Sequence, residues 1–148
     1  MFKRILVPID GSKPSSAGLR AAIALAREQK ARIRLVHLAQ IVVAPPVGGG
    51  FAVSELYDLI RQAGEKLLRR TVRQCRRHEI ECDSKLYVAI VDRASDTILD
   101  EAKKWRADLI VMGTHGRRGI RRLAIGSDAE QVVRGARVPV MLVRATDR

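Results

Sequence analysis

Apolar residues in this chain follow two patterns that alternate along its length. Short and nearly continuous apolar runs, which are typical of strands buried on both faces of a sheet, occupy 5–9, 33–38, 82–89, 107–112 and 138–143. The longer segments between these runs carry apolar residues at helical spacing. The regular order of strand and helix predicts an α/β protein.

Four helices are expected between the five strands. They begin at Ser12, at Val53 or Ser54, at Asp92 and at Ser127. Ser12 is a favourable capping residue, and Pro14 suits the first turn that follows it. The residues expected to face the sheet are Leu19, Ala22, Ile23 and Ala26 in the first helix, Leu56, Ile60, Ala63, Leu67, Thr71 and Cys75 in the second, and Ile98, Leu99, Ala102 and Trp105 in the third.

Strands that are apolar throughout indicate a parallel sheet with helices on both faces. Because crossover connections are right-handed, such a sheet is doubly wound, and its ligands bind beyond the carboxyl ends of the strands where the winding reverses. Asp10 and Gly113 both lie at expected carboxyl ends. If the first and fourth strands are neighbours, these two residues flank one crevice.

The length of 148 residues suits one domain spanning 1–148. No apolar run approaches the ~20 residues that a membrane span requires. The first residues enter a strand directly, so we expect no cleaved signal peptide and a cytoplasmic location. Cys75 and Cys82 form no zinc-like or CxxC pattern, and both are expected to be reduced and structural.

The formal net charge of +12 is unusual. Such a field attracts nucleic acid, anionic lipid or polyphosphate. Aromatic residues make up only 3% of the chain, which gives few stacking platforms for single-stranded nucleic acid. We therefore favour a solvated arginine-rich surface over a nucleic-acid-binding protein.

The segment 113–127, GTHGRRGIRRLAIGS, joins the fourth strand to the last helix. Glycines allow the backbone to approach a phosphate closely, and the free N–H groups of a helix's first turn point toward it. The chain lacks the P-loop pattern GxxxxGK[ST], and no GxGxxG follows the first strand, which disfavours a P-loop NTPase and a dinucleotide oxidoreductase. The segment thus predicts a different kind of phosphate site, or alternatively a loop whose glycines only serve its turns.

Two segments of the chain resemble the hallmark segments of the universal stress protein family: Ile5 to Ser12, and the spacing Gly-x2-Gly-x9-Gly-Ser from Gly113 to Ser127. The terminal run Val138 to Arg144 also resembles that family's last strand, and the likeness covers essentially the whole chain. The spacing marks the ATP-binding branch of the family. The resemblance implies a Rossmann-like, five-stranded parallel sheet in the order 3-2-1-4-5, and a homodimer paired through residues 138–144.

The resemblance also implies where a nucleotide would bind. Asp10 would face the ribose, with Pro8 and Ile9 beside the base and backbone groups of Leu38 at the adenine. Gly113 would lie near the ribose, and Met112, directly before it, is also expected among the nucleotide-binding residues. Gly116, Gly126 and Ser127 would hold the phosphates. Asp10 is equally well explained as a residue that caps the first helix, and Leu38 as a core residue.

Several neighbouring residues modify this expectation. Asp128 and Ala129 stand where the family commonly has a small apolar residue and then a hydroxyl residue. A carboxylate at 128 repels phosphate unless it points outward or favours the positive end of the helix. Arg117 is the arginine of this segment that we expect to close over a triphosphate, and His115 either contacts a phosphate or is a polar loop residue.

The sequence therefore favours a cytoplasmic protein that binds ATP, with Mg²⁺ held mainly by the phosphates, as a nucleotide-dependent switch or sensor. Residues 41–52, rich in proline and glycine, are expected to close over the ligand. Any ATPase activity is expected to be weak, because no residue is evident that would activate water. Two alternatives stay open: an interaction module of the same fold that binds no nucleotide, and a basic protein that binds nucleic acid or a membrane surface through arginines of the helix over 61–77.

Overall fold

Strands and helices alternate throughout the residues that the computed structural model describes, which are 1–41, 53–89, 93–114 and 125–145. The elements, in chain order, are β1 (Arg4–Pro8), α1 (Lys13–Gln29), β2 (Arg32–Gln40), α2 (Val53–Arg77), β3 (Cys82–Ala89), α3 (Ala94–Trp105), β4 (Leu109–Gly113), α4 (Ser127–Gly135) and β5 (Val140–Val143). None of the helices in these residues is long and apolar enough to cross a lipid bilayer.

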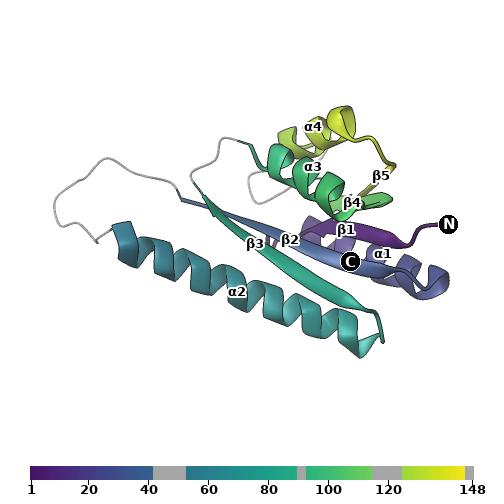
Figure 1. The fold of residues 1–148 in the computed structure, drawn as a ribbon, viewed down its shortest axis with the longest axis horizontal. Helices are drawn as coiled ribbons and strands as arrows, with labels where there is room; N and C mark the ends of the chain where they lie inside the picture. The colour runs from purple at the N-terminus through teal and green to yellow at the C-terminus, as the bar shows by residue number, and fades with distance from the viewer. Residues whose placement is uncertain (42–52, 90–92, 115–124, 146–148) are drawn as a thin grey trace.

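The five strands form one parallel sheet in the order β3-β2-β1-β4-β5 (Figure 1). This confirms the fold class and strand order expected from the sequence. β1 is central, pairing with β2 through Pro8 and Val36 and with β4 through Leu6 and Ile110. The chain winds from β1 to β2 and β3 on one side, then crosses to β4 and β5 on the other. The winding therefore reverses between β1 and β4.

Helices cover both faces of the sheet, because alternate strand residues point to opposite sides. On one face, Ile5, Val7 and Leu35 pack with residues of α1 and α2 such as Leu19 and Leu68. On the other face, the buried residues are Leu6, Val36, Ile110 and Met112 from the strands and Ile98, Ala102, Ala129 and Val132 from α3 and α4. Figure 1 shows α3 and α4 on the opposite side of the sheet from α2.

The expected start of the first helix is confirmed. Ser12 caps α1 by accepting a hydrogen bond from the Ser15 N–H, and Pro14 lies in the first turn. All four residues expected on its inner face are buried. For the third helix, the expected start at Asp92 lies outside the described residues, and α3 begins at Ala94 with Arg93 as its N-cap.

The predicted inner face of the second helix is partly wrong. Thr71 and Cys75 are buried as expected, but Ala63 is exposed, and Gly64 and Leu68 are buried instead. A Cβ atom at Gly64 would lie 2.7 Å from Leu86 Cδ1 and 3.0 Å from His37 Cδ2, so the helix approaches β2 and β3 most closely there. Residues 54–59 at the start of α2 are all exposed, among them Leu56, which had been expected to face the sheet.

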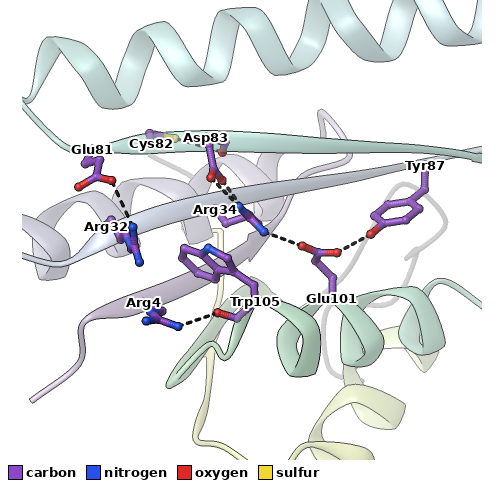
Figure 2. Close-up of polar contacts among 9 residues, drawn as sticks. All are labelled: Arg4, Arg32, Arg34, Glu81, Cys82, Asp83, Tyr87, Glu101 and Trp105. Atoms are coloured by element: carbon purple, nitrogen blue, oxygen red, sulfur yellow. Dashed lines mark hydrogen bonds and ion pairs between the residues drawn. The ribbon is translucent and has the colours of Figure 1, made fainter.

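A polar cluster, formed by Arg34, Asp83, Tyr87 and Glu101, lies on the α3 side of the sheet (Figure 2). Arg34 donates to both carboxylate oxygens of Asp83, at 2.7 and 2.6 Å, and to Glu101 Oε1 at 2.9 Å. The Tyr87 hydroxyl donates to Glu101 Oε2. The Arg34 guanidinium also lies 4.8 Å from the centre of the Trp105 ring, within the range of a cation–π contact.

This cluster predicts an unusual ionisation of Tyr87. Burial, followed by the hydrogen bond to Glu101, raises the pKa of Tyr87 to about 12. In the unfolded chain a tyrosine has a pKa of about 10. The neutral phenol therefore stabilises the folded state fully below about pH 10, and this contribution is lost as the pH rises through the folded pKa of about 12.

The measurement is tyrosinate absorbance after a rapid jump to alkaline pH, recorded before the chain unfolds. The chain has two tyrosines, so the Tyr57→Phe variant leaves Tyr87 as the only one. Adding Glu101→Gln to this variant is expected to lower the Tyr87 pKa, because the acceptor loses its charge. A Tyr87 midpoint near pH 10 that is insensitive to Glu101→Gln would contradict the role of the cluster.

Candidate functional site

The carboxyl end of β1 is joined to β2 through the residues expected to border a base. The Ile9 N–H donates to the Val36 carbonyl at 2.7 Å, and Ile9 is only 4% exposed. The buried His37 places Nδ1 2.6 Å from the Ile9 carbonyl. Because a carbonyl only accepts, Nδ1 carries the proton of this hydrogen bond. Pro8 and Leu38 are half-buried at the same edge, and His37 links β2 to the residue that follows β1.

Asp10 organises the turn between β1 and α1. Its Oδ1 accepts the Ser12 N–H at 2.9 Å, and its own N–H donates to Ser15 Oγ at 3.1 Å. The buried Ser15 in turn donates its N–H to Ser12 Oγ at 3.2 Å. Asp10 therefore has a local role in the turn that leads to the Ser12 cap of α1, without capping the helix itself, and contact with a ribose stays a prediction.

Gly113, at the carboxyl end of β4, allows α1 to pack closely against this strand. A Cβ atom there would lie 2.5 Å from the Pro14 carbonyl carbon and 2.6 Å from its oxygen. Met112 is buried in the core on the α3 and α4 side. What these two residues present at the edge of β4 is therefore their backbone groups, and contact with a ligand there stays a prediction.

The two described ends of the glycine-containing segment are hydrogen-bonded to each other. The Thr114 N–H donates to the Val143 carbonyl at 3.0 Å, which continues the pairing of β4 with β5. The Gly126 N–H then donates to the Thr114 carbonyl at 2.8 Å. Together these bonds fix the start of α4 beside the carboxyl end of β4.

The first turn of α4 follows a glycine, so its N-cap residue has no side chain to accept a hydrogen bond. Gly126 is its N-cap in an extended conformation, with φ −63° and ψ 151°, and its carbonyl accepts the Glu130 N–H at 2.9 Å. Among the residues that the structure describes, no side chain caps this turn, whereas Ser12 caps α1. Ser127 and Asp128 are exposed. Backbone N–H groups at such a helix end, with its positive dipole, bind anions.

The residues after Ser127 differ in their surroundings. Ala129 is 2% exposed and packs in the core with Val132, so a side chain at 129 points away from solvent. Asp128 is exposed in the first turn, where a carboxylate favours the positive end of a helix. Glu130 pairs with Arg134 at 2.8 Å along the helix surface. The missing hydroxyl at 129 thus falls at a core position.

The structure brings together most of the expected site residues. Pro8, Ile9, Asp10, Leu38, Met112, Gly113, Gly126, Ser127 and Asp128 come from β1, β2, β4 and α4, at or beyond the carboxyl ends of the strands. His115, Gly116 and Arg117 lie outside the described residues, as does the segment 42–52. Within the described residues, no group of three or more His, Cys, Asp or Glu side chains is placed to hold a metal ion.

Two residues that fix the backbone around the candidate site, Thr114 and Ser15, were not predicted from the sequence. Ser15 is buried, and its hydroxyl oxygen accepts the Asp10 N–H. Thr114 is buried and joins β5 to the start of α4. Two sequence positions could have indicated these roles. Ser15 lies three residues after the cap Ser12, and Thr114 directly follows Gly113, which ends β4.

A comparison with protein families matches residues 1–144 to the model of the universal stress protein family. Two of the similar curated proteins carry the same family name. One, from Thermus aquaticus, is 33% identical over 150 residues, covering 97% of this chain and 100% of that protein. The other, from Methanocaldococcus jannaschii, is 29% identical over 146 residues, covering 97% of this chain and 83% of that protein.

Solved structures share the fold. The universal stress protein UspA from Lactobacillus plantarum aligns with a TM-score of 0.82 and 25% identity, covering 97% of this chain and 98% of that one. A universal stress protein from Archaeoglobus fulgidus in complex with dAMP aligns with a TM-score of 0.66 and 24% identity, over 96% and 98% of the two chains. A family protein from Arabidopsis thaliana with AMP bound aligns with a TM-score of 0.69 and 18% identity, over 97% and 92%.

Proposed function

The chain belongs to the universal stress protein family, and we propose that it binds an adenine nucleotide at the carboxyl edge of β1 and β4, acting as a nucleotide-dependent switch or sensor. The edge is the point at which the winding of the sheet reverses. Pro8, Ile9 and Leu38 would border the base, Asp10 and Gly113 the ribose, and Gly126 and Ser127 the phosphates.

The first turn of α4, which no side chain caps among the described residues, is the observation that carries this proposal. Its start is fixed by the 2.8 Å hydrogen bond from the Gly126 N–H to the Thr114 carbonyl, so its N–H groups are held in place before a ligand arrives. A phosphate gains from such preorganised donors, because little conformational entropy is lost on binding. The structures of the same fold that contain AMP and dAMP support the choice of an adenylate.

ATP is the nucleotide that we propose as the ligand, because Arg117 and its neighbouring arginines would add charge for a triphosphate. Magnesium would be coordinated mainly by the phosphate oxygens and water, since Mg²⁺ takes few protein ligands beside a nucleotide. Bound in this way, the ion would neutralise phosphate charge. Any hydrolysis is proposed to be slow.

We also propose that the protein forms a homodimer through residues 138–144. β5 is at the edge of the sheet and pairs with β4 on one side only. Met141, within this strand, is 39% exposed. An apolar edge strand readily pairs with a second chain, so the strand offers a ready interface between two copies.

Ser127→Glu is expected to weaken AMP binding roughly tenfold or more, because a carboxylate would compete with the phosphate for the first turn of α4. The measurement is isothermal titration calorimetry with AMP, and with ATP and Mg²⁺. Ser84→Glu is the matched control: it introduces the same charge at an exposed serine of β3, away from the carboxyl edge. The control is expected to bind as the unchanged protein does.

Thermal unfolding gives an independent readout, since a ligand of the folded state must raise the melting temperature. If no adenine nucleotide at millimolar concentration alters the melting temperature or gives a calorimetric signal, the proposal fails. That result would favour the interaction module that binds no nucleotide. Equal weakening by Ser127→Glu and Ser84→Glu would show that only net charge matters, and would remove α4 from the site.

A further inference from the structure

A pocket lies on the α3 side of the sheet, away from the proposed nucleotide edge and toward the amino ends of the strands. Its volume is about 490 Å³, within the range of small-molecule sites. Its basic and aromatic lining comes from β1, β2, β3 and the end of α3: Arg4, Arg34, Lys85, Tyr87, Lys104, Trp105 and Arg106. Arg4 is the first residue of β1, whereas the proposed nucleotide edge lies beyond the strand's last residue, Pro8.

The charge of this pocket is strongly positive. Five of its lining residues are cationic, and Glu101 is its one lining carboxylate within the described part of the chain. Glu101 is already engaged by Arg34 and Tyr87. Among the residues that the structure describes, neither Lys85 nor Lys104 has a carboxylate within ion-pair distance. The pocket therefore concentrates charge that the protein itself does not neutralise.

One wall of the pocket is held rigidly. Arg34 is fixed by two bonds to Asp83 and one to Glu101, and its guanidinium stacks 4.8 Å from the centre of the Trp105 ring. Arg4 Nη1 donates to the Trp105 carbonyl at 3.1 Å. Figure 2 shows these side chains meeting from the strands and from α3. A ligand would thus meet a preformed surface rather than one it must order.

The helix dipole does not account for this charge. Lysines in the last turn of α3 are favoured by the negative end of the helix, which explains Lys103 and Lys104. Arg4 and Lys85 come from β1 and β3, where no such effect acts. Because these cations come from separate elements and line the same pocket, they favour binding of an anion with several charged groups.

We propose that this pocket is a second anion site, which binds a compact ligand carrying two or more phosphate groups. Guanidinium and ammonium groups are the usual protein partners of phosphate oxygens. Because the cations come from three strands and a helix, they can contact several phosphate groups of one ligand at once, which a single phosphate group cannot exploit. The site is separate from the proposed nucleotide edge, so its occupancy does not depend on the proposed function.

Inorganic tripolyphosphate is the probe, and Trp105 is the reporter, because it is the only tryptophan in the chain and it lines the pocket. Titration at constant ionic strength is expected to change the tryptophan fluorescence with saturation. Lys104→Glu is expected to weaken the apparent affinity for tripolyphosphate about tenfold, because it removes a charged contact and replaces the ammonium group by a carboxylate that repels the ligand. Lys103→Glu, the same charge change at the exposed neighbour that does not line the pocket, is expected to leave it nearly unchanged.

Two further experiments distinguish tripolyphosphate binding at this pocket from binding at the nucleotide edge and from nucleic-acid binding. Ser127→Glu is expected to retain the tripolyphosphate response even if AMP no longer binds. Circular dichroism verifies that each variant is folded. A non-saturating response, equal losses in Lys103→Glu and Lys104→Glu, or loss in Ser127→Glu would overturn the proposal. So would binding of single-stranded RNA to this pocket without any response to tripolyphosphate.

Discussion

Gly113→Ala is expected to lower the free energy of unfolding by about 3 kcal/mol, near the upper range for overpacking. The added Cβ would lie 2.5 Å from the Pro14 carbonyl carbon and 2.6 Å from its oxygen. Both are backbone atoms in the first turn of α1, so no side-chain rotation relieves the contact. Either α1 or the end of β4 must move, and both border the proposed nucleotide site.

Urea denaturation followed by circular dichroism measures this loss. Gly135→Ala is the matched control, because its Cβ would come equally close, at 2.6 Å, but to Leu99 Cδ1. The end of a leucine side chain moves at small cost, and alanine has a better helix propensity than glycine by about 1 kcal/mol. The control is expected to stay within about 1 kcal/mol of the unchanged protein. Equal effects of the two substitutions would show that backbone contact at Gly113 is not what limits the packing.

Glu101→Ala is expected to destabilise the protein by about 3 kcal/mol, as removal of one partner of a buried ion pair does. Its side chain is only 4% exposed and accepts from both Arg34 and Tyr87. Removing it takes from Arg34 the acceptor of Nη1, while the two bonds to Asp83 remain, and it takes from Tyr87 the acceptor of its hydroxyl. Chemical denaturation of the purified variant gives the difference in unfolding free energy.

Asp83→Ala provides the control for the same arginine. Its bonds to Arg34 are shorter, at 2.7 and 2.6 Å, and it is the largest cause of the raised pKa of Arg34. However, its side chain is 55% exposed, so water replaces the lost contact and the expected cost is at most about 1 kcal/mol. A larger loss in Asp83→Ala than in Glu101→Ala would contradict the view that burial decides the energetics of this cluster.

The fold followed well from the sequence because strands and helices differ in the spacing of their apolar residues. The start of α4 is confirmed at Ser127, and β3 begins and ends at the expected residues. The inner face of α2 was harder to assign. Its centre includes Gly64, which carries no side chain to reveal the contact, and its first turns have no sheet beneath them to bury Leu56.

The candidate site followed from chain order and glycine spacing, which bring Asp10 and Gly113 to one edge. The polar cluster could not be predicted in the same way. Arg34 lies between apolar residues of β2, and Glu101 beside Ala102 of α3, so each looks like an isolated polar residue in sequence. Their partnership depends on how α3 crosses the sheet, and 67 positions separate them along the chain.

The hydrogen bond between the Gly126 N–H and the Thr114 carbonyl has a consequence for how this protein tolerates change. It closes the base of the segment from 115 to 125, so the sheet and α4 are joined without relying on what that segment contains. Because the entropy of joining two fixed ends varies slowly with the number of residues between them, insertion or deletion between these ends is expected to cost little stability. The sheet and α4 are thus expected to keep their relative placement when the residues between them are changed.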